Sequence, residues 1–514
     1  MESDNKYDVI IIGAGLGGLT AGATLARHGQ RVLILEQHNI PGGCATTFKR
    51  KGVTYEVGLH EMDWGSPDSD MKALIFQKLG ILHKLPLVKL PQVWNVKTET
   101  SLYTVPEGRQ EVITRMGDYF PEDRKTIRQY MRAMKHSAQA VSRLPKDLSP
   151  GQFLLFPFTR LPFMLRDMLC SEHVGAKMDK LLKSNRLKNI LNANMPYFSD
   201  TSSDLSWSYY ACAQYNYFHS AMFVKGGSQV LSNLLAGVIT DSGGEVRTSC
   251  DVKKIILDRK SAVGVTYFDK RKQKELSVYS SVIIANIDPA NIFGGKMVPQ
   301  EIEEPGLEKL EPATSLYTVY VTFKTAPSQK YALAYSNFIY TDRVLNMPPS
   351  ALYPYLKTLP ADERPFVFVD YSTIDSGLTA LGDQRSFAVL TGASQLHEWE
   401  SLTDADYHAA KESLAQNLFR RLDEHYPGIT GMIERYEVST PKTAKRFLRT
   451  RNGTAYGYRN KKYVLSGRLP AKSRIIKGLY YAGAWTAPGG GFTGAIVSGY
   501  IAGKTVIDSK ASVL

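Results

Sequence analysis

The stretch "YDVIIIGAGLGGLTAGATLARHGQRVLILE" (residues 7–36) decides the fold class. Residues 9–12 form a continuous β-branched run, which is typical of a parallel strand that is buried on both faces. Glycines follow at once, residues 19–28 have the pattern of a helix that ends at Gly29, and residues 31–36 have the composition of a second buried strand. The stretch therefore predicts a βαβ unit and a doubly wound α/β domain.

The turn inside this unit carries the pattern G-x-G-x-x-G as Gly13, Gly15 and Gly18, and the second strand ends at Glu36. Gly13 permits the tight turn, Gly15 lets backbone N–H groups approach a pyrophosphate, and Gly18 permits close packing of the helix. The N-terminus of the helix favours anionic oxygens, and the carboxylate of Glu36 would accept hydrogen bonds from ribose hydroxyls. The pattern predicts a dinucleotide site, with a tight turn that binds no ligand as the alternative.

A second glycine-rich segment lies near the other end of the chain. The segment "GLYYAGAWTAPGGGFTGAIVSGYIAG" (residues 478–503) has the pattern of a short strand, a turn and an apolar helix. A glycine pair, Gly42 and Gly43, also follows Glu36 closely, in "PGGCATTF" (residues 41–48). An NAD-binding domain does not ordinarily need this second pair, whereas two-dinucleotide-binding flavoproteins have one. The two segments therefore favour FAD, and a plain loop at residues 489–491 is the alternative.

Composition limits the class of protein. With 514 residues, 43% hydrophobic and 22% charged, the chain can form two or three domains with a substantial core. The four cysteines are scattered without metal-ligand spacing, so we expect neither a disulfide framework nor a metal site. They are Cys44, Cys170, Cys212 and Cys250. No secretory leader or spanning apolar run is visible, so we expect a cytoplasmic protein.

The charge and the hydropathy of the chain favour an anionic membrane surface as a partner. The net charge of +14 favours encounters with anionic surfaces, and no motif for binding nucleic acid is visible. Residues 151–169, "GQFLLFPFTRLPFMLRDML", are rich in Phe and Leu but broken by Pro157 and Pro162. We expect either a membrane-contact patch or the mouth of a substrate tunnel, and a buried helical hairpin of the substrate domain is the alternative. A basic cluster suits either anionic head groups or a solvated face; it comprises Lys442, Lys445, Arg446, Arg449, Arg451, Arg459, Lys461 and Lys462.

Six segments together resemble the phytoene desaturase, carotenoid isomerase and retinol saturase family, within the wider group of amine oxidase-like flavoproteins. They are residues 9–36, 41–48, "YEVGLH" (55–60), "GGSQVL" (226–231), "STPKTAKRFLRTRNGTAYG" (439–457) and "YYAGAWTAPGGGFTGAIVSG" (480–499). The resemblance covers both ends and the middle of the chain and is weak between residues 70 and 220.

The resemblance implies an α/β fold: a Rossmann-type two-dinucleotide-binding FAD domain with an inserted α+β substrate domain. The FAD domain would be discontinuous and consist of residues 1–95, 215–290 and 431–514. The substrate domain would consist of residues 96–214 and 291–430, with the possible membrane-contact segment at 151–169. Mixed strand and helix patterns between residues 290 and 430 agree with this division.

The resemblance also implies bound FAD and a set of residues that hold it. They are Gly13, Gly15, Gly18, Glu36, Gly42, Gly43, Val252, Gly483, Gly491, Phe492 and Thr493. Many flavoproteins place an acidic residue after the glycine of the terminal strand, but here Ala484 and Trp485 follow Gly483. The contacts of these two residues are therefore left unassigned.

His60, the last residue of "YEVGLH", is the candidate catalytic residue. A flavin exchanges the hydride, so the protein supplies position, electrostatics and exclusion of water. His60 resembles the histidine of a short element in saturase-like members, and an ordinary imidazole pKa near neutrality would suit proton transfer. A hydrogen-bonded core histidine is the alternative. Further pocket candidates by proximity are Glu61, Trp64, Tyr456 and Phe492, and Cys44 is expected to pack rather than react.

The expected function is that of an FAD-dependent oxidoreductase acting on carbon–carbon bonds of a lipophilic polyene or isoprenoid, by desaturation, saturation or isomerisation. A flavin amine oxidase on the same scaffold is one alternative. A prenyl-binding module without flavin chemistry, similar to the Rab GDP-dissociation inhibitors, is the other. We expect a lipophilic small molecule as substrate, an anionic membrane surface as a second candidate partner, and no nucleic acid.

Overall fold

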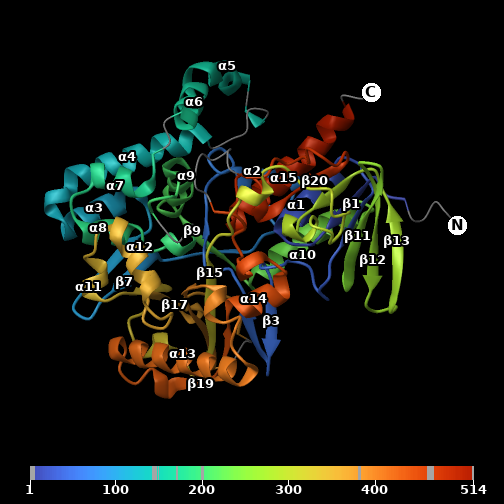
Figure 1. Cartoon of the computed structure of the whole chain (residues 1–514). Coiled ribbons are helices and arrows are strands. Elements are labelled where there is room, and N and C mark those ends of the chain that lie inside the picture. The colour runs from blue at the N-terminus through green and yellow to red at the C-terminus, as the bar shows by residue number, and fades with distance from the viewer. Residues whose placement is uncertain are drawn as a thin grey trace.

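The computed structural model describes residues 6–141, 147–148, 150–169, 172–197, 199, 202–379, 384–459 and 468–511. Cys170, Lys461 and Lys462 lie outside these ranges. Figure 1 shows one body that carries both ends of the chain, a second body below it built around a larger sheet, and a group of helices beside the two.

The first body is built on a parallel five-stranded sheet with the order β10-β2-β1-β14-β20. The strands are β1 (Val9–Ile12), β2 (Val32–Leu35), β10 (Glu245–Arg247), β14 (Ile283–Ala285) and β20 (Leu479–Tyr481). Their distant positions in the chain make this a discontinuous domain. Every residue of β1, β2, β14 and β20 is buried, as expected for strands covered on both faces.

Alternate residues of β1 belong to two different cores. Val9 and Ile11 pack with the helices α1 (Leu16–Ala26), α10 (Ser228–Asp241) and α15 (Gly491–Ala511). Ile10 and Ile12 pack against an antiparallel sheet on the other face. That sheet consists of β11 (Cys250–Asp258), β12 (Ser261–Asp269) and β13 (Lys274–Tyr279). The β-branched run of this strand thus fills two cores at once.

Helices α1 and α15 meet at glycines. A Cβ on Gly499 would lie 2.1 Å from the carbonyl oxygen of Gly17, and a Cβ on Gly17 would lie 2.5 Å from Cα of Gly483. Further along, a Cβ on Gly503 would lie 3.2 Å from the carbonyl oxygen of Ala21. The two ends of the chain can approach this closely only because these positions carry no side chain.

The second body is a mixed seven-stranded sheet with the order β19-β15-β18-β17-β16-β7-β8. Its strands are β7 (Gln92–Lys97), β8 (Leu102–Pro106), β15 (Ser315–Phe323), β16 (Ser336–Ile339), β17 (Phe366–Asp370), β18 (Ser386–Ser394) and β19 (Ile433–Ser439). Helix α13 (Asp404–His425) covers one face, and the other face packs with the core of the first body. The sheet takes in β19 and part of β7, although residues 1–95 and 431–514 were expected in the FAD domain.

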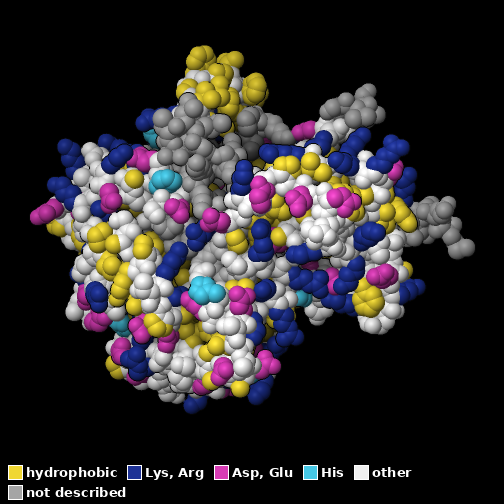
Figure 2. Space-filling view, viewed as in Figure 1, with side chains coloured by type: hydrophobic (Ala, Val, Ile, Leu, Met, Phe, Trp, Pro, Cys, Tyr) yellow, Lys and Arg dark blue, Asp and Glu magenta, His cyan; other side chains and the backbone are white. Residues whose placement is uncertain are grey.

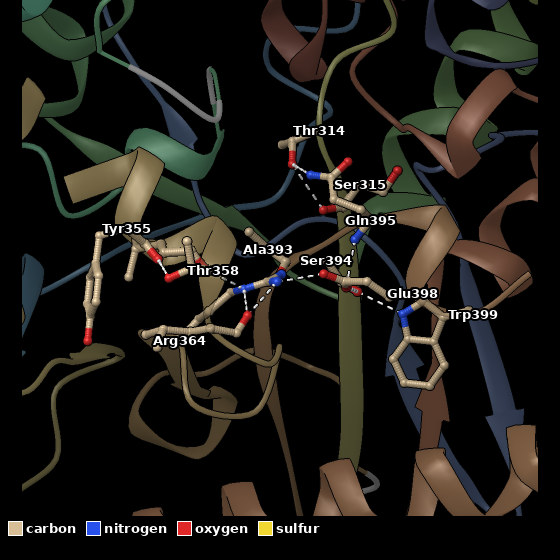
Figure 3. Close-up of polar contacts among 12 residues, drawn as sticks. Thr314, Ser315, Tyr355, Thr358, Arg364, Ala393, Ser394, Gln395, Glu398 and Trp399 are labelled. Carbon is tan, nitrogen blue, oxygen red and sulfur yellow. Dashed lines mark hydrogen bonds and ion pairs between the residues drawn. The ribbon is translucent and has the colours of Figure 1, made fainter. Parts of the chain in front are cut away.

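A buried polar cluster fixes one end of this sheet (Figure 3). Arg364 pairs with Glu398 at 2.6 Å and donates to the carbonyl oxygen of Ala393 at the end of β18. The second carboxylate oxygen of Glu398 accepts from the hydroxyl of Ser394 at 2.6 Å. Because both charges have partners, this buried ion pair joins β18 to the segment before β17 without an unpaired group.

The remaining elements surround the space between the two sheets. A helical group consists of α3 (Arg109–Tyr119), α4 (Arg124–Val141), α7 (Val174–Leu181), α8 (Asn185–Leu191) and α9 (Trp207–Tyr217), and α5 (Pro150–Thr159) and α6 (Leu161–Leu169) project from it (Figure 1). Shorter helices are α2 (Met71–Leu79), α11 (Asp342–Leu345), α12 (Pro349–Thr358) and α14 (Pro441–Leu448). Short strands are β3 (Thr47–Arg50), β4 (Val53–Glu56), β5 (Met62–Asp63), β6 (Leu87–Lys89) and β9 (Ala221–Val224).

The predicted fold class is confirmed. The βαβ unit predicted from residues 7–36 is β1-α1-β2, and the terminal segment forms β20 and α15 as expected. Helix α1 begins three residues earlier than predicted, because the helix starts within the glycine-rich turn itself. Helix α13 lies within residues 290–430, where mixed strand and helix patterns were expected.

Replacement of Gly499 by alanine is predicted to destabilise the protein by about 1–3 kcal/mol, because the new methyl group would overlap a backbone oxygen of α1. The matched control is Gly237→Ala on α10, where a Cβ would meet no atom within 4 Å. That control should be neutral or stabilising by up to about 1 kcal/mol. Chemical denaturation of both variants measures the difference, and equal stability would contradict the close contact between α1 and α15.

Candidate active site

One large cavity of about 2280 Å³ extends from the glycine-rich loops of the five-stranded sheet to the seven-stranded sheet and the α5–α6 hairpin. Typical small-ligand pockets have volumes of about 300–1000 Å³. The cavity therefore has room for a dinucleotide and a second ligand.

The loop after β1 forms one end of this cavity. Gly13 and Gly15 line it, and Gly13 has a φ of +93°, in the region that favours glycine. Gly18 lies behind the loop, where a Cβ would be 2.2 Å from the carbonyl oxygen of Gly13, so it serves helix packing as predicted. Gly42 donates its N–H to the carbonyl oxygen of Ala14 at 2.8 Å, which brings the second glycine pair beside the first loop.

Glu36 lines the cavity at the carboxyl end of β2 and is held by two backbone groups. Its carboxylate oxygens accept from the N–H groups of Ala14 at 2.7 Å and His38 at 2.8 Å. These bonds fix its orientation and leave other lone pairs for ribose hydroxyls. Gly43 and Val252 line the cavity as well.

The terminal segment closes the same region from the other side. Gly483, Gly491, Phe492 and Thr493 all line the cavity, and α15 begins at Gly491. The first N–H groups of a helix have no acceptor within that helix, so they suit the polar edge of a flavin ring. The hydroxyl of Thr493 donates to Asp63 at 2.7 Å and so ties the start of α15 to β5. The residues present therefore fit FAD.

Asn286, which sequence reasoning missed, connects the loops that build this end. It follows β14 and donates from its side-chain amide to the carbonyl oxygen of Gly13 at 3.1 Å. Its side-chain oxygen lies so close to Gly483 that a Cβ there would approach it to 2.3 Å. A polar residue directly after a buried parallel strand is the signal that could have identified it.

Glu56 was also missed, although it lies inside a recognised motif. Its buried carboxylate accepts four hydrogen bonds: from the N–H groups of Gly58 and Leu59, and from the N–H and hydroxyl of Ser228. Burial raises the pKa of Glu56 to about 7, while these donors oppose the rise. The bonds join the start of α10 to the loop that carries His60 and Glu61.

His60 lines the cavity but is almost fully buried. The hydroxyl of Tyr371 donates to the carbonyl oxygen of Leu59 at 3.0 Å, so Tyr371 accepts from Nδ1–H of His60 at 2.9 Å. Nε2 is then left as an acceptor. Burial lowers the pKa of His60 to about 4, so the expectation of a pKa near neutrality is wrong. The catalytic role of His60 stays a prediction.

Glu61 follows His60 on the same loop but has no hydrogen-bond partner like Tyr371 for its carboxyl group among the described residues. It lines the cavity, is 6% exposed, and neither of its carboxyl oxygens has a hydrogen-bond partner among the described residues. Burial raises the pKa of Glu61 to about 8, so the group is mostly protonated at neutral pH.

Of the other pocket candidates, some line the cavity and one does not. Tyr456 and Phe492 line the cavity, whereas Trp64 is not among its lining residues and lies under the ammonium group of Lys72, 4.8 Å from the ring centre. Cys44 lines the cavity, and burial raises the pKa of its thiol to about 11. A thiol that is protonated in this way is a poor nucleophile.

The apolar segment at residues 151–169 forms the projecting hairpin α5–α6 (Figures 1 and 2). None of the described residues of α5 is buried, so the interpretation as a buried hairpin is wrong. Phe153, Leu154 and Phe158 are 61%, 75% and 81% exposed. Phe163 and Met164, by contrast, line the cavity. The hairpin thus has an apolar side in solvent and a side in the cavity.

Helix α14, which carries Lys442, Lys445 and Arg446 of the basic cluster, lies well away from α5 and α6 in Figure 1. Part of the cluster is paired within the protein. Arg449 forms two hydrogen bonds to Asp251, at 2.7 and 2.9 Å, and Arg451 pairs with Asp288 at 3.4 Å. These arginines therefore organise the Glu36 end of the cavity instead of forming a free basic surface.

The described residues contain neither a membrane-spanning helix nor a metal site. No helix among them is long and apolar enough to cross a membrane. Within the same residues, no group of three or more His, Cys, Asp or Glu side chains is arranged to hold a metal ion.

Comparisons with known proteins agree with this geometry. The family model described as flavin-containing amine oxidoreductase matches residues 16–507. Chloroplastic prolycopene isomerase from Arabidopsis thaliana is 27% identical over 535 residues, which cover 99% of this chain and 85% of that protein. All-trans-retinol 13,14-reductase from Rattus norvegicus is 24% identical over 484 residues, which cover 88% of this chain and 77% of that protein.

Among solved structures, cyclohexylamine oxidase from Brevibacterium oxydans matches with a TM-score of 0.58 and 17% identity. The match covers 98% of this chain and 99% of that one. At this level of identity the likeness shows a shared fold alone.

Replacement of Gly15 by valine is predicted to abolish dinucleotide binding. A Cβ at this position would already lie 3.0 Å from the side-chain amide of Asn286, and the two methyl groups beyond it would occupy the path of the pyrophosphate. Gly431→Val is the matched control, since Gly431 is exposed and a Cβ there meets no atom within 4 Å. Flavin absorbance per purified protein is the measurement, and full occupancy in the Gly15 variant would refute the assignment.

Proposed function

The chain belongs to the family of flavin-containing amine oxidoreductases, and we propose that it uses FAD to add or remove hydrogen across carbon–carbon bonds of a lipophilic polyene, or to isomerise them. The observation that carries this proposal is the continuity of one cavity from the dinucleotide loops to the apolar α5–α6 hairpin. A long apolar ligand can enter such a cavity from the hairpin end and extend toward the flavin.

The chain's own residues would hold and surround FAD. When FAD is bound, Glu36 would accept hydrogen bonds from ribose hydroxyls, the loop with Gly13 and Gly15 would hold the pyrophosphate, and the start of α15 would hold the polar edge of the ring. Bound FAD would supply hydride exchange. Substrate would lie against side chains of the seven-stranded sheet and of the α5–α6 hairpin, among them Tyr320, Phe163 and Met164.

The relatives support the choice of a polyene. The two proteins described above carry names that refer to a carotene and to a retinol, and they match this chain over most of its length. The amine oxidase resembles it only in fold.

We infer in addition that the α5–α6 hairpin contacts a membrane surface and receives the substrate there. Phe153, Leu154 and Phe158 face outward, and burial of each is worth about 1.5–3 kcal/mol. A basic residue near an anionic surface contributes about 1 kcal/mol. The apolar contribution therefore dominates, and Phe163 and Met164 on the inner side offer an apolar path into the cavity.

The proposed activity predicts a selective response of the flavin enzyme to polyenes. Under anaerobic conditions, all-trans-retinol or a poly-cis carotene should be reduced, desaturated or isomerised by the protein in one of its flavin oxidation states, as measured by chromatography of the extracted polyenes. Amines such as putrescine and cyclohexylamine should leave oxidised flavin unchanged. Bleaching of the flavin by an amine, with unchanged polyenes, would replace this proposal with amine oxidation.

The hairpin proposal predicts binding to vesicles of phosphatidylcholine and phosphatidylserine that high salt weakens only in part. The combined replacements Phe153→Ser, Leu154→Ser and Phe158→Ser should abolish co-flotation with the vesicles. The control replaces Leu102 and Tyr279, which are exposed elsewhere at 47% and 48%, by serine. Unchanged flotation of the triple variant would show that the hairpin does not bind lipid.

A further inference from the structure

The cavity contains a buried acid for which the fold provides no partner. Glu61 is 6% exposed, yet neither carboxyl oxygen accepts or donates a hydrogen bond among the described residues. Glu56, five positions earlier, is also buried and receives four hydrogen bonds. A buried polar group without partners costs stability, so its presence beside a cavity points to a function.

The groups around Glu61 leave it uncharged. The ionisable side chains that act on it from neighbouring segments are the hydroxyls of Tyr197, Tyr217 and Tyr335, and Asp63 lies near on its own segment. Burial raises the pKa of Glu61 and of all three tyrosines. Desolvation by burial raises the pKa of Glu61 and so favours the neutral form of the acid.

His60, by contrast, cannot supply a proton at neutral pH. Its Nδ1–H is engaged with Tyr371, its Nε2 carries a lone pair, and burial lowers its pKa to about 4. The loop therefore places side by side a histidine that is already deprotonated and an acid that still holds its proton. Of these two residues, only Glu61 can act as a proton donor to a ligand in the cavity.

We propose that Glu61 is the proton donor to a substrate carbon during carbon–carbon bond reduction, a role that rests on the proposed function. One alkene carbon receives a hydride, which reduced flavin supplies when bound. The electron pair of the double bond moves to the other alkene carbon. This carbon takes the proton of Glu61, so that the O–H bond of the acid breaks and a C–H bond forms. The resulting carboxylate takes a proton from water. In the reverse direction the carboxylate of Glu61 would accept the proton, and bound oxidised FAD would supply the acceptor for the hydride.

The test compares the wild-type holoenzyme with Glu61→Gln, after reduction of the flavin with dithionite and addition of all-trans-retinol or a poly-cis carotene. Glu61→Gln keeps the size of the side chain but removes its acidic proton. We expect full flavin occupancy, KM within a few-fold of the wild type, and a fall in kcat of about 10²- to 10⁴-fold. Glu61→Asp should recover part of kcat, because it restores an acid on a shorter chain. Glu275→Gln, on an exposed strand position, is the matched control and should behave as wild type.

A second measurement reports on Glu61 without turnover. The folded-state pKa of about 8 exceeds the ordinary value of 4.5, so the stability associated with the protonated acid is complete below pH 4.5 and is lost as pH rises toward 8. The unfolding midpoint of Glu61→Gln should therefore rise relative to that of the wild type as pH increases from 4.5 to about 8. Above pH 8 the difference between the two midpoints should stay constant.

Each outcome discriminates. Turnover of Glu61→Gln equal to that of the wild type would overturn the role of Glu61 alone, and so would a difference in unfolding midpoint that does not change with pH. Absence of turnover by the wild type with both polyenes would overturn the proposed function and this role with it. A loss of kcat with retained flavin, partial recovery in Glu61→Asp and a pH-dependent stability difference would establish the proton donor.

Discussion

The close packing of Gly17 of α1 against Gly499 of α15 and against Gly483, in the turn before α15, is the constraint on which the rest of the structure depends. These positions allow a segment near the end of the chain to pack against the first helix at backbone distance. The side chain of Asn286 lies between them and bonds to the loop at Gly13, so three distant parts of the chain meet at one point. Without this meeting, the dinucleotide loop and the start of α15 would not face the same cavity.

Burial sets the chemistry of that cavity. Glu56, His60 and Glu61 lie within six positions of one another, yet their states differ. Glu56 accepts four hydrogen bonds, His60 is a neutral base, and Glu61 is a neutral acid. The difference arises from the partners that each receives: backbone and hydroxyl donors for Glu56, Tyr371 for His60, and none among the described residues for Glu61. One loop therefore places a deprotonated histidine, His60, and a protonated acid, Glu61, beside the same cavity.

The sequence predicted what depends on local pattern. The β-branched run, the glycine spacing and Glu36 lie within one βαβ unit, so the fold class and the dinucleotide loop could be derived from a single stretch. The partners of His60 and Glu56 could not, because Tyr371 is 311 positions from His60 and Ser228 is 172 positions from Glu56, and these pairs come together only in the folded chain. The same reason applies to the pKa of His60, since desolvation is a property of the assembled core. Composition also could not predict that Phe153 and its neighbours are exposed. An apolar hairpin interrupted by prolines has the same sequence pattern whether it is buried in a core or lies in solvent.

The strand order β1-β14-β20 has a consequence for biosynthesis. The first two strands of the parallel sheet are made early, but β20 and α15 leave the ribosome more than four hundred residues later. At about 5–20 residues per second this interval lasts roughly 20 s or more, during which the nascent sheet lacks an edge strand and a covering helix. The dinucleotide site is therefore complete only after α15 has emerged, and until then the buried strand β14 lacks its partner β20.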